Sequence, residues 1–134
     1  MSTISANRYN PNFLISGIAG EALTAGYAVN LTAANTWSIA DNGEAMGGIV
    51  VEAVAAAGDA CSVAIGGIGP MIVDGSGTAI AAGDALKPDA GSVGKGIVTT
   101  TDRDKYGARA LEAATTDGAI INVLILPYSE RSTA

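Results

Sequence analysis

The chain has 134 residues, of which 49% are hydrophobic and only 15% are charged, so its composition predicts one folded domain rather than a disordered polypeptide. Its formal net charge of −6 gives a surface that repels phosphate, and we therefore expect no nucleic-acid partner. The absence of histidine excludes Ser-His-Asp and Cys-His catalysis and removes most zinc sites.

The pattern along the chain predicts three parts. Residues 1–16 are expected to form an extended N-terminal arm, because asparagine and proline interrupt any periodicity there. Residues 17–126 are predicted to be a single β domain, and residues 127–134 a short polar tail. Bulky apolar side chains and one cation in the arm and the tail are our candidate interface residues. They are Tyr9, Phe13, Leu14, Tyr128 and Arg131.

The β domain contains an internal repeat, approximately residues 20–66 and 77–125. The matching blocks are Gly20–Val29 with Gly77–Leu86, and Gly47–Ile65 with Gly107–Ile125. The first pair is offset by 57 residues and the second by 60, and the blocks come in the same order. Chance similarity between segments rich in alanine and glycine is the alternative, but two ordered blocks at near-equal offsets favour a duplication.

Each copy of the repeat is predicted to contain an antiparallel hairpin. Gly48–Val54 is rich in β-branched residues and is followed by a turn and the apolar run Ala60–Ile65. Tyr106–Ala114 alone also fits a short helix, because alanine, leucine, glutamate and arginine all favour one. We assign a strand because its counterpart in the first copy reads as a strand, and Ala119–Leu126 completes the second hairpin.

A turn motif, Ala-Gly-x-Ala-apolar, comes before the hairpin in both copies. Gly26 and Gly83 are expected to supply the positive φ angle of this turn. Further strands are predicted at residues 36–40, 71–74 and 96–100. Eight to ten short strands with regular turns predict an all-β fold, a small barrel or sandwich built from two similar halves, with at most a short helical turn.

We find no pattern that indicates an enzyme, a metal site or a cofactor. A glycosidase carboxylate pair needs a cleft lined by aromatic side chains, which are scarce here. Several aspartates stand beside glycine and are expected to bond their own backbone in turns instead: Asp59, Asp84, Asp89 and Asp117. The glycine-rich loops lack the spacing of a phosphate-binding loop.

Four other residues each leave two interpretations open. Cys61 lies in an apolar run and is expected to be buried and inert rather than reactive. Trp37 is expected in the core rather than on a binding surface. Glu52 and Glu112 occupy the same repeat position, where they either face solvent on alternating strands or contribute to a partner interface.

Three patterns in order resemble the capsid cement, or head decoration, proteins of tailed bacteriophages. They are Ala-Gly-x-Ala-apolar, Gly-x-x-x-x-Glu-Ala, and a terminal Leu-Glu-Ala-Ala-Thr-Thr-Asp-Gly-Ala-Ile-Ile-Asn-Val-Leu-Ile. Ala82–Leu86 and Arg109–Ile125 carry the resemblance and Gly47–Val63 supports it, over roughly residues 17–126.

The resemblance implies a non-enzymatic structural protein on the outer surface of the virion capsid, made in the host cytoplasm. Its implied partners are the major capsid protein and further copies of itself in a homotrimer. Its implied role is to stabilise the capsid lattice by bridging neighbouring subunits. We found no signal-peptide pattern and no apolar stretch long enough for a membrane helix, so we expect no membrane partner.

Other functions remain open at this point. The chain also fits another virion component, such as a head-fibre base or a tail decoration, or a carbohydrate-binding module. A small hydrolase is disfavoured by the missing histidine.

Overall fold

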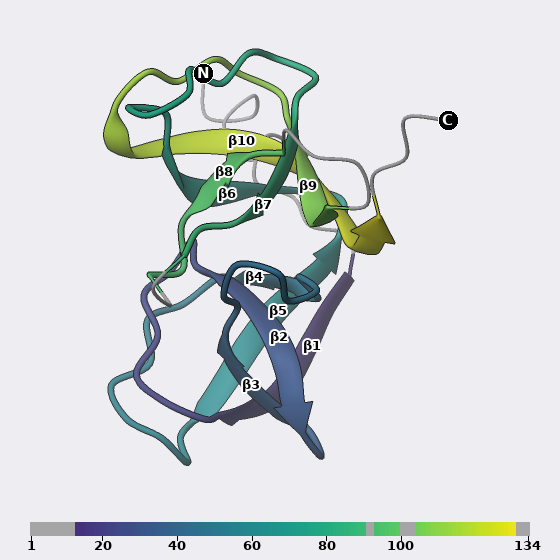
Figure 1. The fold of residues 1–134 in the computed structure, drawn as a ribbon. Coiled ribbons are helices and arrows are strands. Elements are labelled where there is room, and N and C mark those ends of the chain that lie inside the picture. The colour runs from purple at the N-terminus through teal and green to yellow at the C-terminus, as the bar shows by residue number, and fades with distance from the viewer. Residues whose placement is uncertain (1–12, 91–92, 100–103, 131–134) are drawn as a thin grey trace, which may run out of the picture.

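The computed structural model describes residues 13–90, 93–99 and 104–130, which form ten β-strands and no helix (Figure 1). The first half contains β1 (Phe13–Ala19), β2 (Ala28–Ala33), β3 (Thr36–Ile39), β4 (Gly48–Val50) and β5 (Ala60–Gly66). The second half contains β6 (Ile68–Asp74), β7 (Ala85–Pro88), β8 (Gly96–Val98), β9 (Lys105–Ala110) and β10 (Asp117–Glu130). In these ranges there is accordingly no helix of the length and apolarity that crossing a membrane requires. The predicted all-β fold class is confirmed.

Each half closes its own five-stranded barrel, and Figure 1 shows the two barrels one above the other. The strand order is β1-β3-β2-β4-β5 in the first barrel and β10-β6-β8-β7-β9 in the second, which is the same cyclic order with every strand number raised by five. In both barrels the first and third strands run parallel, and all other neighbours are antiparallel. The two predicted halves therefore share one topology.

The backbone hydrogen bonds also repeat at the offsets found in the sequence. An isolated bridge and a turn hydrogen bond in the first barrel recur 57 and 60 residues later in the second. The equivalent pairs are Leu23–Val54 with Ile80–Ala114, and Gly26–Val50 with Gly83–Ala110. The internal duplication is thus a duplication of structure.

The predicted hairpins β4–β5 and β9–β10 are both antiparallel, as expected. Their first strands are shorter than predicted, however, since β4 ends at Val50 and β9 at Ala110. The chain then leaves the ladder, and residues 54 and 114 instead form isolated bridges with Leu23 and Ile80, which precede β2 and β7. The sequence pattern could not distinguish these isolated bridges from a continuous strand.

The predicted arm and tail boundaries also differ from the structure. Phe13–Ser16 belong to β1, where they pair with β5, and residues 127–130 belong to β10. Pairing with β1 satisfies β5 backbone groups that would otherwise be a free edge, so barrel closure recruits a segment that looked irregular. A register shift between Ile125 and Ser129 lets β10 pass Pro127 without losing its partner β9. Tyr9 and Arg131, with the rest of the arm and tail, lie outside the described residues.

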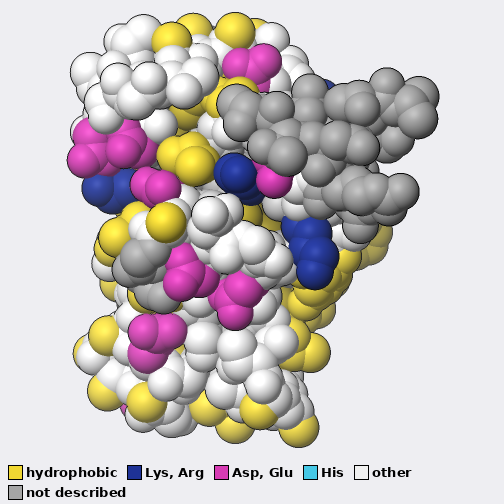
Figure 2. All heavy atoms as spheres, viewed as in Figure 1, with side chains coloured by type: hydrophobic (Ala, Val, Ile, Leu, Met, Phe, Trp, Pro, Cys, Tyr) yellow, Lys and Arg dark blue, Asp and Glu magenta, His cyan; other side chains and the backbone are white. Residues whose placement is uncertain are grey.

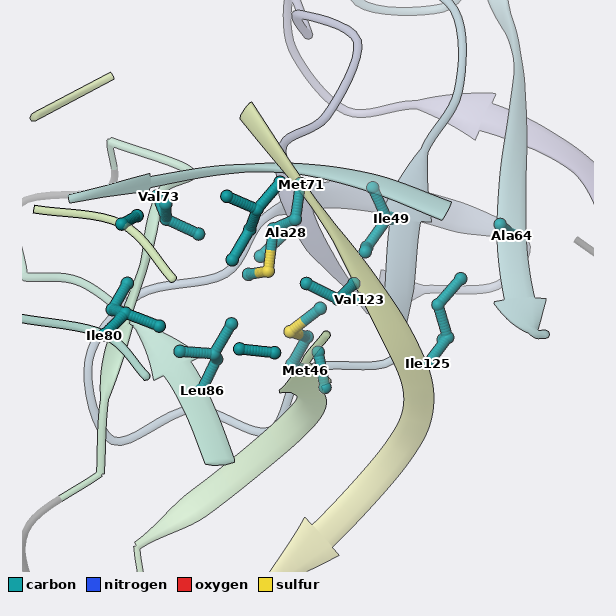
Figure 3. Packing of buried hydrophobic residues seen from close by; sticks show 14 of the residues in the cluster. Ala28, Met46, Ile49, Ala64, Met71, Val73, Ile80, Leu86, Val123 and Ile125 are labelled. Atoms are coloured by element: carbon teal, nitrogen blue, oxygen red, sulfur yellow. The ribbon is translucent and has the colours of Figure 1, made fainter. Parts of the chain in front are cut away.

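The core is shared between the barrels, which explains why they form one unit. Met46, in the loop before β4, is fully buried among second-barrel residues that include Leu86 and Val123 (Figure 3). Its carbonyl accepts a hydrogen bond from the Tyr128 backbone N at 2.8 Å. Gly107 leaves space for the Met46 side chain, because a Cβ on residue 107 would lie 2.6 Å from Met46 Cβ.

The turn glycines provide a matched pair for mutation. Gly26 has φ 96° and Gly83 has φ 94°, as the turn motif predicted. A Cβ on Gly26 would lie 2.9 Å from Ile72 Cγ1, whereas a Cβ on Gly83 would meet nothing within 4 Å.

We expect Gly83→Ala to lower the free energy of unfolding by about 1–2 kcal/mol through backbone strain alone. Gly26→Ala should cost about 1–3 kcal/mol more, because the added methyl also overpacks Ile72. Urea unfolding of both variants measures the difference. Equal losses would show that the Ile72 side chain moves aside freely.

Candidate interaction surface

Exposed apolar side chains are concentrated on β1 and β10. Of the ten large hydrophobic residues exposed in the described part of the chain, seven lie on these two strands. They are Phe13, Leu14, Ile15 and Ile18 on β1, and Ile120, Leu124 and Tyr128 on β10. Exposed apolar residues scattered singly are ordinary, but a concentration of them marks an interaction site. We call this set the β1/β10 surface.

The fold brings the start of β1 and the end of β10 to the same side of the molecule. Phe13 pairs with Gly66 at the end of β5, and the next carbonyl, that of Gly67, accepts a hydrogen bond from Ile125 N of β10 at 2.9 Å. In Figure 1 the start of β1 and the end of β10 lie on the same side, where the barrels meet. Hydrophobic atoms follow the edge formed by β1 in Figure 2. Three predicted interface residues, Phe13, Leu14 and Tyr128, therefore lie close to the junction of the barrels.

The two aromatic side chains of the β1/β10 surface, Phe13 and Tyr128, are held in place although they remain exposed. The Phe13 ring is 63% exposed yet lies against Gly66, where a Cβ would come within 2.8 Å of it. Tyr128 is 54% exposed, and its hydroxyl lies against Gly47. Its φ of 56° is unusual for a bulky residue and costs conformational energy, so the surrounding contacts hold this ring in place. Such fixed aromatic side chains lose little entropy when a partner covers them.

Three of the four described cations are occupied by groups of the protein itself. Lys87 Nζ lies 3.2 Å from Asp104, and Lys95 Nζ lies 2.8 Å from Asp117, a contact that raises the pKa of Lys95. Arg109 donates to the Gly83 carbonyl at 2.9 Å. These three residues form local contacts rather than a row that could follow a phosphate backbone.

One pocket of about 250 Å³ contains carboxylates, but one of them, Asp74, is unsuited to act as a general acid. The pocket is lined by Asp74, Lys87 and Asp89, among others. Ser76 donates to Asp74 Oδ1 from its backbone N at 2.9 Å and from its hydroxyl at 2.6 Å, and these bonds lower the pKa of Asp74. A general acid at neutral pH needs the opposite shift.

The turn role predicted for the aspartates is confirmed at two positions. Asp84 Oδ2 accepts a hydrogen bond from Ala81 N at 2.9 Å, and Asp89 Oδ1 accepts one from Ala90 N at 2.7 Å. Among the residues that the structure describes, no group of three or more cysteine, aspartate or glutamate side chains could hold a metal ion.

Cys61 and Trp37 are both buried, as predicted, with 4% of each residue exposed. Burial raises the pKa of the Cys61 thiol, although a backbone hydrogen bond with Gly17 opposes this shift. The protonated, inaccessible thiol should therefore not act as a nucleophile.

We expect Ellman's reagent to label Cys61 of the native protein at least about a hundredfold more slowly than a small free thiol, because labelling requires local or global opening. In denaturing urea the single thiol should react at the rate of an unfolded peptide. Stoichiometric labelling of the native protein within minutes at pH 7 would show that β5 opens readily or that the thiol is accessible.

Glu52 and Glu112 differ although they occupy equivalent positions. Glu52 is exposed, which agrees with a solvent-facing residue. Glu112 is half-buried, and its Oε2 accepts a hydrogen bond from Asn122 N at 2.7 Å. Sequence reasoning also missed Ile120 and Leu124, although the apolar run of β10, interrupted only by Asn122, was a signal that both faces of this strand are largely apolar.

The structure defines the chain as a tandem of two closed five-stranded barrels with identical topology and a shared core. No protein-family model and no curated protein sequence matches it. Among solved structures, it is similar to the crystal structure of the head fiber gp8.5 N base in bacteriophage phi29, with a TM-score of 0.63. The match covers 89% of this chain and 98% of that chain at 19% sequence identity, so it shows a shared fold.

Proposed function

We propose that this chain is a non-enzymatic structural protein of a bacteriophage virion that binds the outer surface of the assembled head. The observation that carries the proposal is the fold shared with the head fiber gp8.5 N base along almost the whole of both chains. The exposed β1/β10 surface supports it, because an attachment protein needs a contact surface and no reaction site.

The closed barrels determine how this chain would contact the capsid. Closure leaves few free sheet edges, so a partner must be bound through side chains on the outer faces of strands. The β1/β10 surface includes one strand of each barrel, and the shared core holds the two strands in a fixed relation. A contact made there would use both barrels as one rigid body.

We further propose that the protein stabilises the lattice by bridging neighbouring major capsid subunits as a homotrimer. A trimer presents three copies of one surface, and weak single contacts become strong through effective concentration. If only the mature lattice offers the complementary sites, binding would stabilise that lattice by mass action.

The alternative within the same class is a head-fibre base, which the fold likeness itself favours. Such a protein would attach to the head without strengthening the lattice. The two roles therefore differ in what binding does to the capsid.

The test mixes purified full-length protein with heads that lack decoration. Saturable binding together with greater resistance of the heads to heat supports the bridging role. Saturable binding without added resistance supports the fibre base and overturns bridging. Absence of binding at micromolar protein overturns head attachment in both forms, and sedimentation equilibrium of the free protein tests the trimer.

A further inference from the structure

The outer face of β1 is exposed, although the equivalent strand of the second barrel is covered. Gly17 and Ala19 are buried, so the alternating residues Leu14 and Ile18 point away from the first barrel. Their exposed fractions are 53% and 43%. Every residue of β6, by contrast, is buried or half-buried. The same strand of the repeat is thus open in one copy and covered in the other.

The first barrel is what covers β6. Ile72 N donates to the Gly26 carbonyl at 3.0 Å, and a Cβ on Gly26 would lie 2.9 Å from Ile72 Cγ1. Ile18 pairs with Ala60, and Ile72 pairs with Ile120. Because the repeat matches residue 60 with residue 120, Ile18 is the equivalent of Ile72. In the second copy this strand face therefore receives another folded barrel, whereas in the first copy it remains available to a partner.

The charges of the first barrel are all of one sign. No lysine or arginine occurs between positions 13 and 66, and the two ion pairs that the structure describes both join residues of the second barrel. A barrel with carboxylates and no cations attracts a positively charged partner. Its charged residues are Glu21, Asp41, Glu44, Glu52 and Asp59.

Three of these carboxylates flank the exposed face of β1. Glu21 follows the strand by two residues, and the carbonyl of Asp59 accepts a hydrogen bond from Ala19 N at 2.9 Å, at the same end of β1. Glu52 comes two residues after β4, the strand that pairs with the other side of β5. All three are exposed, and Figure 2 shows carboxylates and hydrophobic atoms on the surface of the first barrel. The β1 face thus has an apolar centre and acidic surroundings.

The charge balance indicates the kind of partner. A second copy of the chain is disfavoured, because its second barrel also carries more carboxylates than cations, and three of its four described cations are bound by its own groups. Phosphate surfaces are repelled for the same reason, whether they belong to a nucleic acid or to a membrane. A protein with an apolar patch surrounded by basic residues complements both features of the β1 face.

We propose that the outer face of β1, centred on Leu14 and Ile18, docks an apolar patch of a partner protein. Lysine or arginine residues around that patch meet the carboxylates of Glu21, Glu52 and Asp59. The apolar contact determines how slowly the complex dissociates, and the exposed charges accelerate association. This inference deepens the proposed head attachment and rests on it for the identity of the partner.

Association of the full-length protein with undecorated heads, followed by biolayer interferometry, tests the charges. We expect the association rate to fall at least about tenfold between about 50 and 300 mM NaCl. The double variant Glu52→Gln/Asp59→Asn should associate at least about threefold more slowly than the unmodified protein at the lower salt concentration. Its dissociation rate should change little.

Asp84→Asn/Asp89→Asn is the matched control, because it removes the same charge from the second barrel. Each amide keeps an oxygen that can accept the turn hydrogen bond of the aspartate it replaces. The control should associate like the unmodified protein. An equal loss in both double variants would show that net charge alone drives association, and it would overturn the acidic surroundings of β1 as the contact.

Ile18→Thr tests the apolar centre, because it keeps a β-branched side chain in the strand and shortens its apolar part. Dissociation from heads should become at least about fivefold faster, whereas Leu31→Thr on β2 should dissociate like the unmodified protein. An unchanged rate in Ile18→Thr would overturn the proposal. Self-association of the unmodified protein that Ile18→Thr abolishes, measured by sedimentation equilibrium, would assign the face to a second copy and would also overturn it.

A soluble probe separates this inference from head attachment. A short peptide of alternating leucine and lysine, titrated into the full-length protein, should give saturable NMR shifts of the Leu14 and Ile18 methyl groups, and the same peptide with glutamate in place of lysine should not. If heads fail to bind while these shifts are found, head attachment is wrong and the β1 face still binds a basic, apolar partner. Equal shifts with both peptides, or shifts centred on other residues, would contradict the inference.

Discussion

Met46→Ala is expected to lower the free energy of unfolding by about 2–5 kcal/mol, as large a loss as we foresee for any single substitution in this chain. Met46 is fully buried, belongs to the first barrel and lies among core residues of the second (Figure 3). Truncation at Cβ leaves a cavity at the junction, where neither barrel can collapse without moving the other.

Urea unfolding followed by circular dichroism and by Trp37 fluorescence measures this loss. Trp37 lies in the first-barrel core cluster, so its fluorescence reports on one half, while circular dichroism reports on both. We expect the two signals to coincide in the unmodified protein, because a shared core makes unfolding cooperative. Leu31→Ala, at a side chain 47% exposed on β2, is the control and should cost less than about 1 kcal/mol. A similar small loss in Met46→Ala would mean that the barrels are stable without this contact.

The sequence predicted the architecture well because a duplication supplies its own check. The ambiguous segment Tyr106–Ala114 is predicted as a strand only because its counterpart Gly48–Val54 is β-branched, and β9 confirms this prediction over residues 106–110. Gly26 and Gly83 likewise appeared at equivalent places, and both have a positive φ. The local sequence patterns and the repeat therefore predicted the same strands and turns where interactions between residues close in sequence decide the structure.

Long-range pairing was what the sequence did not reveal. Phe13–Ser16 follow asparagine and proline and have no clear alternation, so nothing local indicated that they pair with β5, some fifty residues later. The same is true of β10, where residues beyond Pro127 return to pair with β9 after a register shift. Barrel closure decides both boundaries, and closure is a property of the whole half rather than of any segment.

The sequence pointed to three residues of the β1/β10 surface, but it placed them in irregular segments rather than on strands. Phe13, Leu14 and Tyr128 were chosen as bulky side chains in an arm and a tail, whereas the structure places them on strands beside the barrel junction. The exposure of β1 had no sequence signal, because it depends on how the two barrels pack, with the first barrel covering β6 and leaving β1 open.

Under the proposed attachment to phage heads, Leu14→Asp and Tyr128→Asp are each expected to weaken head binding at least about tenfold, and more when combined. Leu14 is 53% exposed and Tyr128 is 54% exposed, so either carboxylate is tolerated by the free protein. In the complex, the same carboxylate would be covered by a partner without a matching cation, and this desolvation opposes binding.

Co-sedimentation with undecorated heads measures the affinity, and thermal unfolding verifies that each variant folds. Leu31→Asp is the matched control, because Leu31 is a comparably exposed leucine on a strand outside the β1/β10 surface. It should bind like the unmodified protein. If Leu31→Asp loses as much affinity as Leu14→Asp, added negative charge explains the effect; if none of the three loses affinity, head attachment uses another face of the barrels.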